Sequence, residues 1–273
     1  MFIPDYVETY GIDDLKSSLK AMEYITQLTS CEFAIRPFII KYPQKTMDQI
    51  LKWSLHKNLD VRRLASEGSR PRLPWAMALP DFKKDPSEIL PILENLKEDD
   101  SEYVRRSVAN NLNDISKDHP KVLLKIAKQW KGLGKETDAM IKHASRTLLK
   151  AGDPSIMKFY GLDTKGVGVE NFKVVNPKVK VGEYVRFEFD LSLKKNKYLR
   201  LEYAIHFLLK NGKQNKKVFK ISEKDYEKKS ITHIERGHSF KPISTRTYYA
   251  GKHGVSIIVN GVVFGTAEFT VKL

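Results

Sequence analysis

The residues from Arg62 to Trp75 combine one carboxylate, four arginines and a tryptophan, which together could bind a polyanion and carry out chemistry on it. Read as a helix that begins at Val61, the segment places Arg63, Glu67 and Arg70 on one face. The opposite face is an apolar stripe of Val61, Leu64, Ala65 and Gly68. A solvated helix face stays open as an alternative, because Arg63 and Glu67 have the i, i+4 spacing of a surface ion pair.

Trp75 differs from the other two tryptophans of the chain. Pro71 and Pro74 end the helix and direct Trp75 away from it, among arginines, so we interpret this side chain as part of a binding site. Trp53 and Trp130 fall within apolar helical patterns instead, and we expect both of them in the core.

The start of this helix recurs along the chain. Val61-Arg62-Arg63 returns 43 residues later as Val104-Arg105-Arg106, and more loosely, after a further 37 residues, as Ile141-Lys142-His143. A period near 40 residues predicts HEAT-type helical repeats, in which each unit buries its apolar face against its neighbours. In this frame the positions of Arg63, Glu67 and Arg70 correspond to Arg106, Asn110 and Asn113, and then to His143, Thr147 and Lys150.

A second carboxylate falls in the same register. Glu32 stands 35 residues before Glu67, and Arg36 follows it by one helical turn. We therefore expect Glu32 and Glu67 on neighbouring repeats, in a concave groove shared with Arg63, Arg70, Arg106 and His143. The alternative is a repeat scaffold that binds nucleic acid or an acidic protein without chemistry, although such a scaffold has no need for two acids in register.

Four segments of the chain resemble the AlkC branch of the HEAT-like-repeat alkylpurine DNA glycosylases. They are residues 2–7 (FIPDYV), 32–38 (EFAIRPF), 61–75 (VRRLASEGSRPRLPW) and 105–114 (RRSVANNLND). The resemblance covers nearly the whole chain, because that branch also carries an immunoglobulin-like domain after its repeats. Relatives usually begin with further helices, whereas this chain opens inside the pattern, and we expect a truncated reading frame.

The resemblance implies excision of small cationic N-alkylated bases such as 3-methyladenine from double-stranded DNA, without a metal or cofactor and without the base flipping usual for glycosylases. Glu32 and Glu67 would take the two catalytic positions. The lesion and nearby phosphates would be lined by Trp75, Arg63, Arg70 and Arg72. Further DNA contacts are expected from Arg36, Arg106, Asn110, Asn113, His143 and Lys150.

This chemistry accounts for the residue types. Alkylation at N3 makes the purine cationic, so the base leaves as a neutral molecule and needs little help from a general acid. The sugar then resembles an oxocarbenium ion, which paired carboxylates can stabilise while one of them orients the attacking water. A tryptophan face attracts a cationic base by about 0.5–2 kcal/mol, and arginines neutralise phosphates.

Composition agrees with a basic protein of two parts. The net charge is +15, and residues 170–273 contribute 21 Lys and Arg against 10 Asp and Glu. This balance favours nucleic acid or an anionic membrane surface as a partner, and we expect the second part to add DNA affinity without catalytic groups. One cysteine excludes an internal disulfide, and no signal peptide or membrane-spanning run is evident, so we expect a cytoplasmic monomer.

The two parts divide in the glycine-containing stretch from Gly152 to Gly168. We assign residues 1–165 to a HEAT-like α-helical repeat solenoid and residues 170–273 to an immunoglobulin-like antiparallel β-sandwich. In the second part hydrophobic residues alternate from Leu199 to Leu209 and from Tyr184 to Leu193, and Asn260-Gly261 between two apolar runs predicts a hairpin.

Several other signals carry little weight. The seven histidines are scattered and none pairs with another at metal-ligand spacing, so no metal site is predicted. Gly166 and Gly168 do not precede a helix and no GxxxxGK motif occurs, which makes ATP chemistry improbable.

Overall fold

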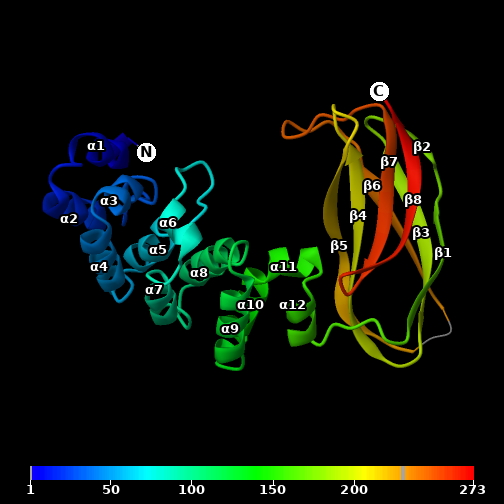
Figure 1. The fold of residues 1–273 in the computed structure, drawn as a ribbon, viewed down its shortest axis with the longest axis horizontal. Helices are drawn as coiled ribbons and strands as arrows, with labels where there is room; N and C mark the ends of the chain where they lie inside the picture. The colour runs from blue at the N-terminus through cyan, green and yellow to red at the C-terminus, as the bar shows by residue number, and fades with distance from the viewer. Residues whose placement is uncertain (1, 229–230) are drawn as a thin grey trace. The chain divides into compact units, whose positions relative to one another are not determined.

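The computed structural model describes residues 2–228 and 231–273, which form two compact units, Met1–Leu148 and Leu149–Leu273. The first unit is helical and the second is built mainly from strands (Figure 1). This architecture confirms the predicted order of a helical repeat followed by a β-sandwich. Within the described residues, no helical segment combines the length and hydropathy that a bilayer crossing requires.

The helices of the first unit follow one another in short antiparallel steps. They are α1 (Phe2–Tyr10), α2 (Leu15–Ile25), α3 (Ile35–Lys41), α4 (Pro43–Trp53), α5 (Leu59–Gly68), α6 (Pro80–Lys84), α7 (Leu90–Asn95), α8 (Glu102–Ile115), α9 (Pro120–Trp130), α10 (Lys135–Ala144) and α11 (Arg146–Ala151), the last of which crosses into the second unit. Prolines occupy the first turns of α4 and α9, where a missing N–H costs no intrahelical bond.

The second helices of successive repeats pack side by side, α5 on α8 and α8 on α10. Arg62 and Arg105 show the repeat most directly, because both have the same role at the start of their helices. The Arg62 guanidinium donates to the carbonyls of His56 and Lys57, each at 3.0 Å. Arg105 donates to the carbonyls of Asp99 and Asp100, at 2.6 and 2.9 Å.

Trp53 and Trp130 also occupy equivalent places. Both lie in the core, as predicted, and each indole N–H donates to a glutamate of a preceding helix, to Glu23 at 2.7 Å and to Glu94 at 2.8 Å. These bonds satisfy the polar end of an otherwise buried side chain.

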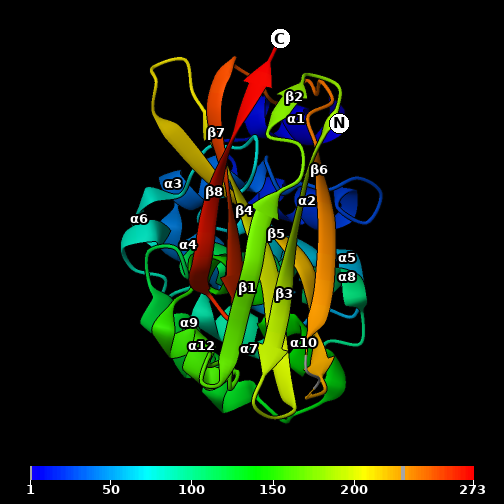
Figure 2. The same cartoon turned by 90° about the vertical axis from the view of Figure 1, so that its right-hand side faces the viewer.

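In its described residues, the second unit is a two-sheet sandwich of eight strands, preceded by the helix α12 (Pro154–Phe159). The strands are β1 (Val167–Val174), β2 (Lys178–Lys180), β3 (Tyr184–Leu193), β4 (Lys197–Leu208), β5 (Gln214–Tyr226), β6 (Thr232–Ser239), β7 (Gly251–Val259) and β8 (Val262–Lys272). One sheet has the order β1-β3-β6, visible side by side in Figure 2, and the other the order β2-β8-β7-β4-β5. Pairing is antiparallel, as predicted, except that the three-residue strand β2 runs parallel to β8.

The predicted alternation and turns are present. Buried residues alternate along β3, and the inward side chains of β4 contribute to one apolar core with those of β7. Asn260 and Gly261 connect β7 to β8 with φ angles of 46° and 79°, the left-handed conformations that a two-residue hairpin requires.

The chain changes from helix to strand between Phe159 and Val167. Helical structure continues through α12 to Phe159, and the first strand begins at Val167. A Cβ atom on Gly152 would lie 2.6 Å from the Gly261 carbonyl oxygen, so only glycine fits where this segment approaches the β7–β8 hairpin. The helical segment from Leu149 to Phe159 belongs to the second compact unit.

His238 lies in the core of the sandwich and is 9% exposed. Its Nδ1 atom is 3.0 Å from the Tyr203 hydroxyl, and its ring packs against the ring of Phe219. Burial, together with the positive charges of Arg246 and Lys217, lowers the pKa of His238 to about 4. The folded unit therefore holds a neutral imidazole, whereas the unfolded chain protonates near the ordinary pKa of about 6.5.

We expect this difference to make the second unit less stable in acid. Between pH 6.5 and pH 4 the unfolded chain binds a proton at His238 that the folded unit does not bind. The free energy of unfolding therefore has its full value above about pH 6.5 and falls by about 3 kcal/mol as the pH approaches 4. All three tryptophans lie in the first unit, so tryptophan fluorescence does not report on the second unit. The measurement is instead hydrogen exchange of the backbone amides in β4 and β7, corrected for the intrinsic exchange rates. His238→Gln should lose most of this acid dependence; equal dependence in both proteins would contradict the assignment.

Candidate functional site

The C-terminal turn of α5 is the centre of the site. Asn58 caps the helix, its side chain accepting the Asp60 backbone N–H at 2.8 Å, and the helix ends at Gly68. A Cβ atom on Gly68 would come within 2.6 Å of the Ile35 side chain, so the absence of a side chain lets α3 pack closely against α5. Glu67 thereby lies near Glu32, which directly precedes α3.

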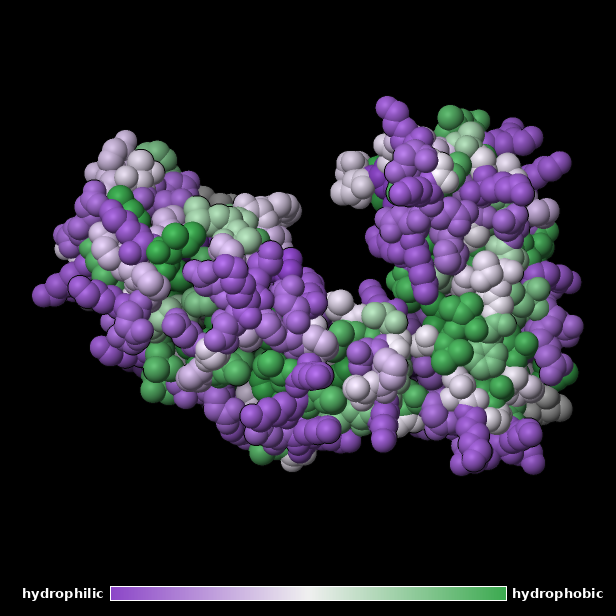
Figure 3. Space-filling view, viewed as in Figure 1, coloured by the Kyte–Doolittle hydropathy of each residue, from purple (hydrophilic) through white to green (hydrophobic). Residues whose placement is uncertain are grey.

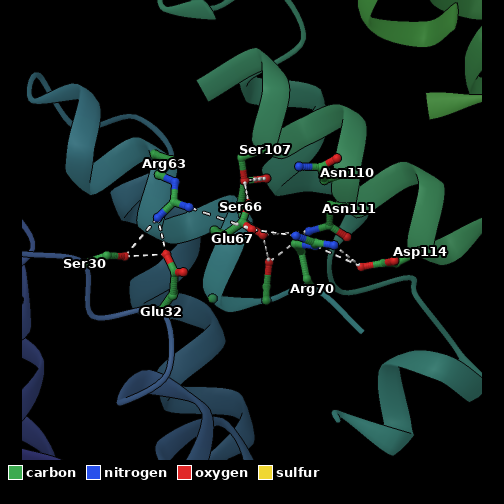
Figure 4. A network of polar contacts seen from close by, with 12 residues as sticks. Ser30, Glu32, Arg63, Ser66, Glu67, Arg70, Ser107, Asn110, Asn111 and Asp114 are labelled. Atoms are coloured by element: carbon green, nitrogen blue, oxygen red, sulfur yellow. Dashed lines mark hydrogen bonds and ion pairs between the residues drawn. The ribbon is translucent and has the colours of Figure 1, made fainter. Parts of the chain in front are cut away.

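Two hydrogen bonds hold the Glu67 carboxylate, which is 7% exposed. Arg70 Nη1 donates to Oε1 at 2.6 Å, and the Ser107 hydroxyl on α8 donates to Oε2 at 2.5 Å (Figure 4). Arg70 follows the end of the helix rather than continuing it as predicted, but its side chain still reaches Glu67.

Arg63 joins the two predicted catalytic carboxylates. Its Nη1 atom donates to Glu32 Oε2, and its Nη2 atom lies 3.8 Å from Glu67 Oε1. Ser30 also donates to Glu32, which is 20% exposed. Figure 4 shows the Arg63 guanidinium between the two acids, so the structure brings together the residues that the repeat register predicted.

The network continues away from Glu32 with alternating charges. Arg70 Nη2 lies 2.8 Å from Asp114 Oδ2, and Lys117 Nζ lies 2.9 Å from Asp114 Oδ1. Burial opposes the charge on Arg70, but Glu67 and Asp114 outweigh it and raise the pKa of Arg70 above its ordinary value. Arg70 thus stays charged inside the protein, where it neutralises two acids rather than a phosphate.

Trp75 extends fully into solvent, with 99% of its surface exposed. Its φ angle is 65°, a left-handed conformation that is uncommon for a bulky residue and that favours a functional explanation. The side chain is therefore accessible to a ligand.

Arg36 holds the loop that carries Trp75. Its side chain is completely buried, and Nε donates to the Met77 carbonyl at 2.7 Å. Nη1 donates to the carbonyls of Gly68 and Arg70, each at 2.9 Å. Burial and the nearby charge of Arg70 lower the pKa of Arg36 to about 10, which still leaves it protonated at neutral pH. The structure gives Arg36 a role inside the fold in place of the predicted DNA contact, because none of its surface is accessible.

Other predicted contact residues are partly engaged within the protein. Arg72 forms a bidentate pair with Asp118 at 2.7 and 3.2 Å. Asn113 is buried and accepts the Thr147 hydroxyl at 2.9 Å, so a direct DNA contact does not suit it. Asn110 is partly exposed and accepts from Arg146 at 3.0 Å.

Arg106 and His143 are exposed and line one hollow, formed by residues of α8 and α10. Partial desolvation of the ring, together with the charges of Arg146 and Arg106, lowers the pKa of His143, so its ring is neutral at neutral pH and supplies no positive charge. Lys150 is exposed and belongs to the second unit, beyond Leu148.

Sequence reasoning missed several residues of the network, among them Ser107, Asp114 and Tyr103. The Tyr103 ring lies 4.7 Å from the Arg63 guanidinium carbon, and it covers the arginine that joins the two carboxylates. The available signal was the spacing of polar residues in the 105–114 segment, where positions 107, 111 and 114 share one helix face.

One cluster in the second unit has metal-ligand chemistry: Glu188, His233 and Glu235 have ligand atoms within 4.8 Å of one another. His233 already contacts Asp190 through Nδ1 at 2.8 Å and Glu235 through Nε2 at 3.4 Å. The bond to Asp190 raises the pKa of His233 and favours the imidazolium, which has no lone pair for a metal. We therefore interpret the cluster as a surface ion-pair network.

The burial of Arg36 leads to a stability prediction. Arg36→Met keeps the length of the side chain but leaves three carbonyl groups without their donor, so we expect a loss of about 3 kcal/mol or more in unfolding free energy. Urea denaturation followed by tryptophan fluorescence measures it, because all three tryptophans lie in the first unit. The control Arg72→Met removes a partly exposed pair and should cost about 1 kcal/mol or less. Similar losses in both variants would argue against the proposed role of Arg36.

Comparisons with known proteins agree with this geometry. Residues 168–273 match the family model described as "Uncharacterised protein YhaZ, C-terminal Ig-like domain". The chain is 46% identical to the protein YhaZ of Bacillus subtilis (strain 168) over 272 residues, which are 99% of this chain and 76% of that protein. The solved structure of Pseudomonas fluorescens alkylpurine DNA glycosylase AlkC, bound to DNA containing an abasic site analog, is 38% identical, with a TM-score of 0.95 over 100% of this chain and 77% of the other. At this identity and coverage, the chain belongs to the AlkC family of alkylpurine DNA glycosylases.

Proposed function

We propose that this protein is a DNA glycosylase that excises small cationic N-alkylated bases, of the 3-methyladenine type, from double-stranded DNA. The observation that carries the proposal is the pair of carboxylates joined by Arg63 near the protein surface. Membership of the AlkC family supports the reaction class, and the AlkC relative was solved on DNA with an abasic site analog, which represents the product of base excision.

The two carboxylates differ in environment, and this difference suggests a division of labour. Both oxygens of Glu67 accept hydrogen bonds from within the protein, so its charge is fixed in place and suited to stabilising an oxocarbenium-like sugar. Glu32 is the more exposed of the two, and we assign it the orientation of the attacking water. The base leaves as a neutral molecule, so neither group has to protonate it.

Trp75 would supply selectivity for the charged base. An indole face attracts a cation by about 0.5–2 kcal/mol through its quadrupole and offers no such attraction to the neutral counterpart. Since the side chain is already extended into solvent, it can contact a base without rearrangement of the core.

DNA affinity would come in part from the second unit, which holds most of the excess positive charge. Lys210, Lys213, Lys216 and Lys217 lie exposed on the hairpin between β4 and β5, and hydrophilic residues cover much of this unit in Figure 3. We assign such lysines to phosphate contacts, which strengthen binding in a salt-dependent manner.

The carboxylates provide the main test. Glu67→Gln and Glu32→Gln keep the shape of each side chain but remove its charge, and each should slow base release about 10²–10³-fold, or about 3–4 kcal/mol. The measurement is single-turnover release of 3-methyladenine from methylated duplex DNA. Both variants should bind undamaged DNA at least as well as the parent, because each removes a negative charge.

Glu102→Gln is the matched control. Glu102 is an exposed acid at the start of α8, and among the described residues it forms no hydrogen bond or ion pair with Glu32 or Glu67. Its rate should equal that of the parent. Full activity in the Glu32→Gln/Glu67→Gln double variant would remove the carboxylate mechanism. A parent that binds methylated DNA but releases no base would favour the repeat scaffold.

Trp75 provides a second test. Trp75→Ala should reduce the single-turnover rate on the cationic lesion about 2- to 30-fold, the range that corresponds to a cation–π contact. Trp75→Phe should lose less, and neither should change the melting temperature, because the side chain is fully exposed. Leu28→Ala removes another exposed apolar side chain and serves as the control. Unchanged rates in both Trp75 variants would exclude the contact.

A further inference from the structure

The 105–114 segment of α8 contains a polar stripe that the carboxylate mechanism does not by itself explain. Ser107, Asn111 and Asp114 stand at the spacing i, i+4, i+7 and therefore share one face of the helix. In the structure this face meets the last turn of α5, and each member contacts a different group there. Such regularity calls for an explanation, because polar side chains are costly to bury unless they are paired.

We propose that Ser107 is a positioning residue that sets the orientation of the Glu67 carboxylate for catalysis. The inference rests on the proposed function, in which Glu67 stabilises the transition state. It extends that function to a residue on another helix that touches neither the base nor the sugar.

The hydrogen-bond geometry fixes the direction of donation. The Ser107 oxygen lies 2.5 Å from Glu67 Oε2 and 3.0 Å from the Ser66 hydroxyl. A serine has one hydroxyl proton, and a carboxylate is a stronger acceptor than a hydroxyl, so Ser107 donates to Glu67 rather than to Ser66. The short distance agrees with a charge-assisted bond.

Burial makes this donor hard to replace. Ser66 and Ser107 are both almost completely excluded from solvent, so water cannot readily substitute for the lost hydroxyl. The other two stripe residues anchor the surroundings: Asn111 Nδ2 donates to the Ser66 carbonyl at 2.8 Å, and Asp114 accepts from Arg70 Nε at 2.9 Å. Bonds from two sides thus define the plane of the Glu67 carboxylate.

Ser107→Ala tests the inference. Removal of one hydrogen bond to a charged group, with the resulting freedom of the carboxylate, should slow single-turnover base release about 10- to 100-fold. Affinity for methylated duplex DNA should stay within about 2-fold, because no phosphate contact changes. The control is Ser116→Ala, which removes another buried serine at the end of the same helix, whose hydroxyl donates to the Asn113 carbonyl. It should keep the parent rate.

Two further variants separate positioning from a loss of fold. In a Glu67→Gln background, Ser107→Ala should slow the reaction less than about 2-fold further, since no charged carboxylate is left to orient. Ser107→Thr keeps the hydroxyl and should restore most of the rate, provided that its melting temperature matches the parent.

The outcomes distinguish this inference from the proposed function. An active parent, an inactive Glu67→Gln variant and a fully active Ser107→Ala variant would overturn the role of Ser107 alone. Equal losses from Ser107→Ala in both backgrounds would indicate general destabilisation and would also overturn it. An inactive parent would instead overturn the proposed function.

Discussion

Glu32 and Glu67 carry like charges, and the Arg63 guanidinium that contacts both makes their approach possible. Two carboxylates brought together without a cation would repel each other, and one of them would become protonated. The position of Arg63 depends in turn on how α3, α5 and α8 pack. Arg63 belongs to α5, its partner Glu32 directly precedes α3, and Tyr103 on α8 covers its guanidinium. The stacking of repeats and the chemistry of the site are therefore one arrangement.

Burial of so many charges opposes folding unless each is paired and hydrogen-bonded. The alternation of Glu32, Arg63, Glu67, Arg70, Asp114 and Lys117 meets this condition through direct contacts between neighbours. Serines add further donors to both acids: Ser30 shares Glu32 Oε2 with Arg63, and Ser107 donates to Glu67 Oε2, the oxygen that Arg70 does not contact. The network thus pairs each of the two carboxylates with a cation at a site where the proposed reaction develops positive charge, and its three acids and three bases leave no net excess of either sign.

Sequence periodicity was sufficient for the features that depend on local geometry. Helical spacing placed Arg63 and Glu67 on one face, and the repeat frame brought Glu32 beside them. In the same frame Asn110 is the sequence equivalent of Glu67, yet the residue that contacts Glu67 is Ser107. The reason is that side chains of neighbouring helices interdigitate, so equivalent positions do not face each other directly. The burial of Arg36 was not predictable either. Its partners are backbone carbonyls 32 to 41 residues away, and no pattern of side-chain types identifies a carbonyl group.

The loop that carries Trp75 shows how a buried side chain can support an exposed residue for which we propose a binding role. A left-handed backbone at a bulky residue costs about 1–3 kcal/mol and persists only where the surroundings define it. Arg36 bonds to carbonyls on both sides of Trp75, at Arg70 and Met77, and prolines at positions 71 and 74 restrict the chain between them. The backbone at Trp75 is thereby restrained before any ligand arrives, so ordering of the loop does not subtract from the free energy of binding. A buried arginine that touches no substrate in this way determines where the exposed aromatic ring can act.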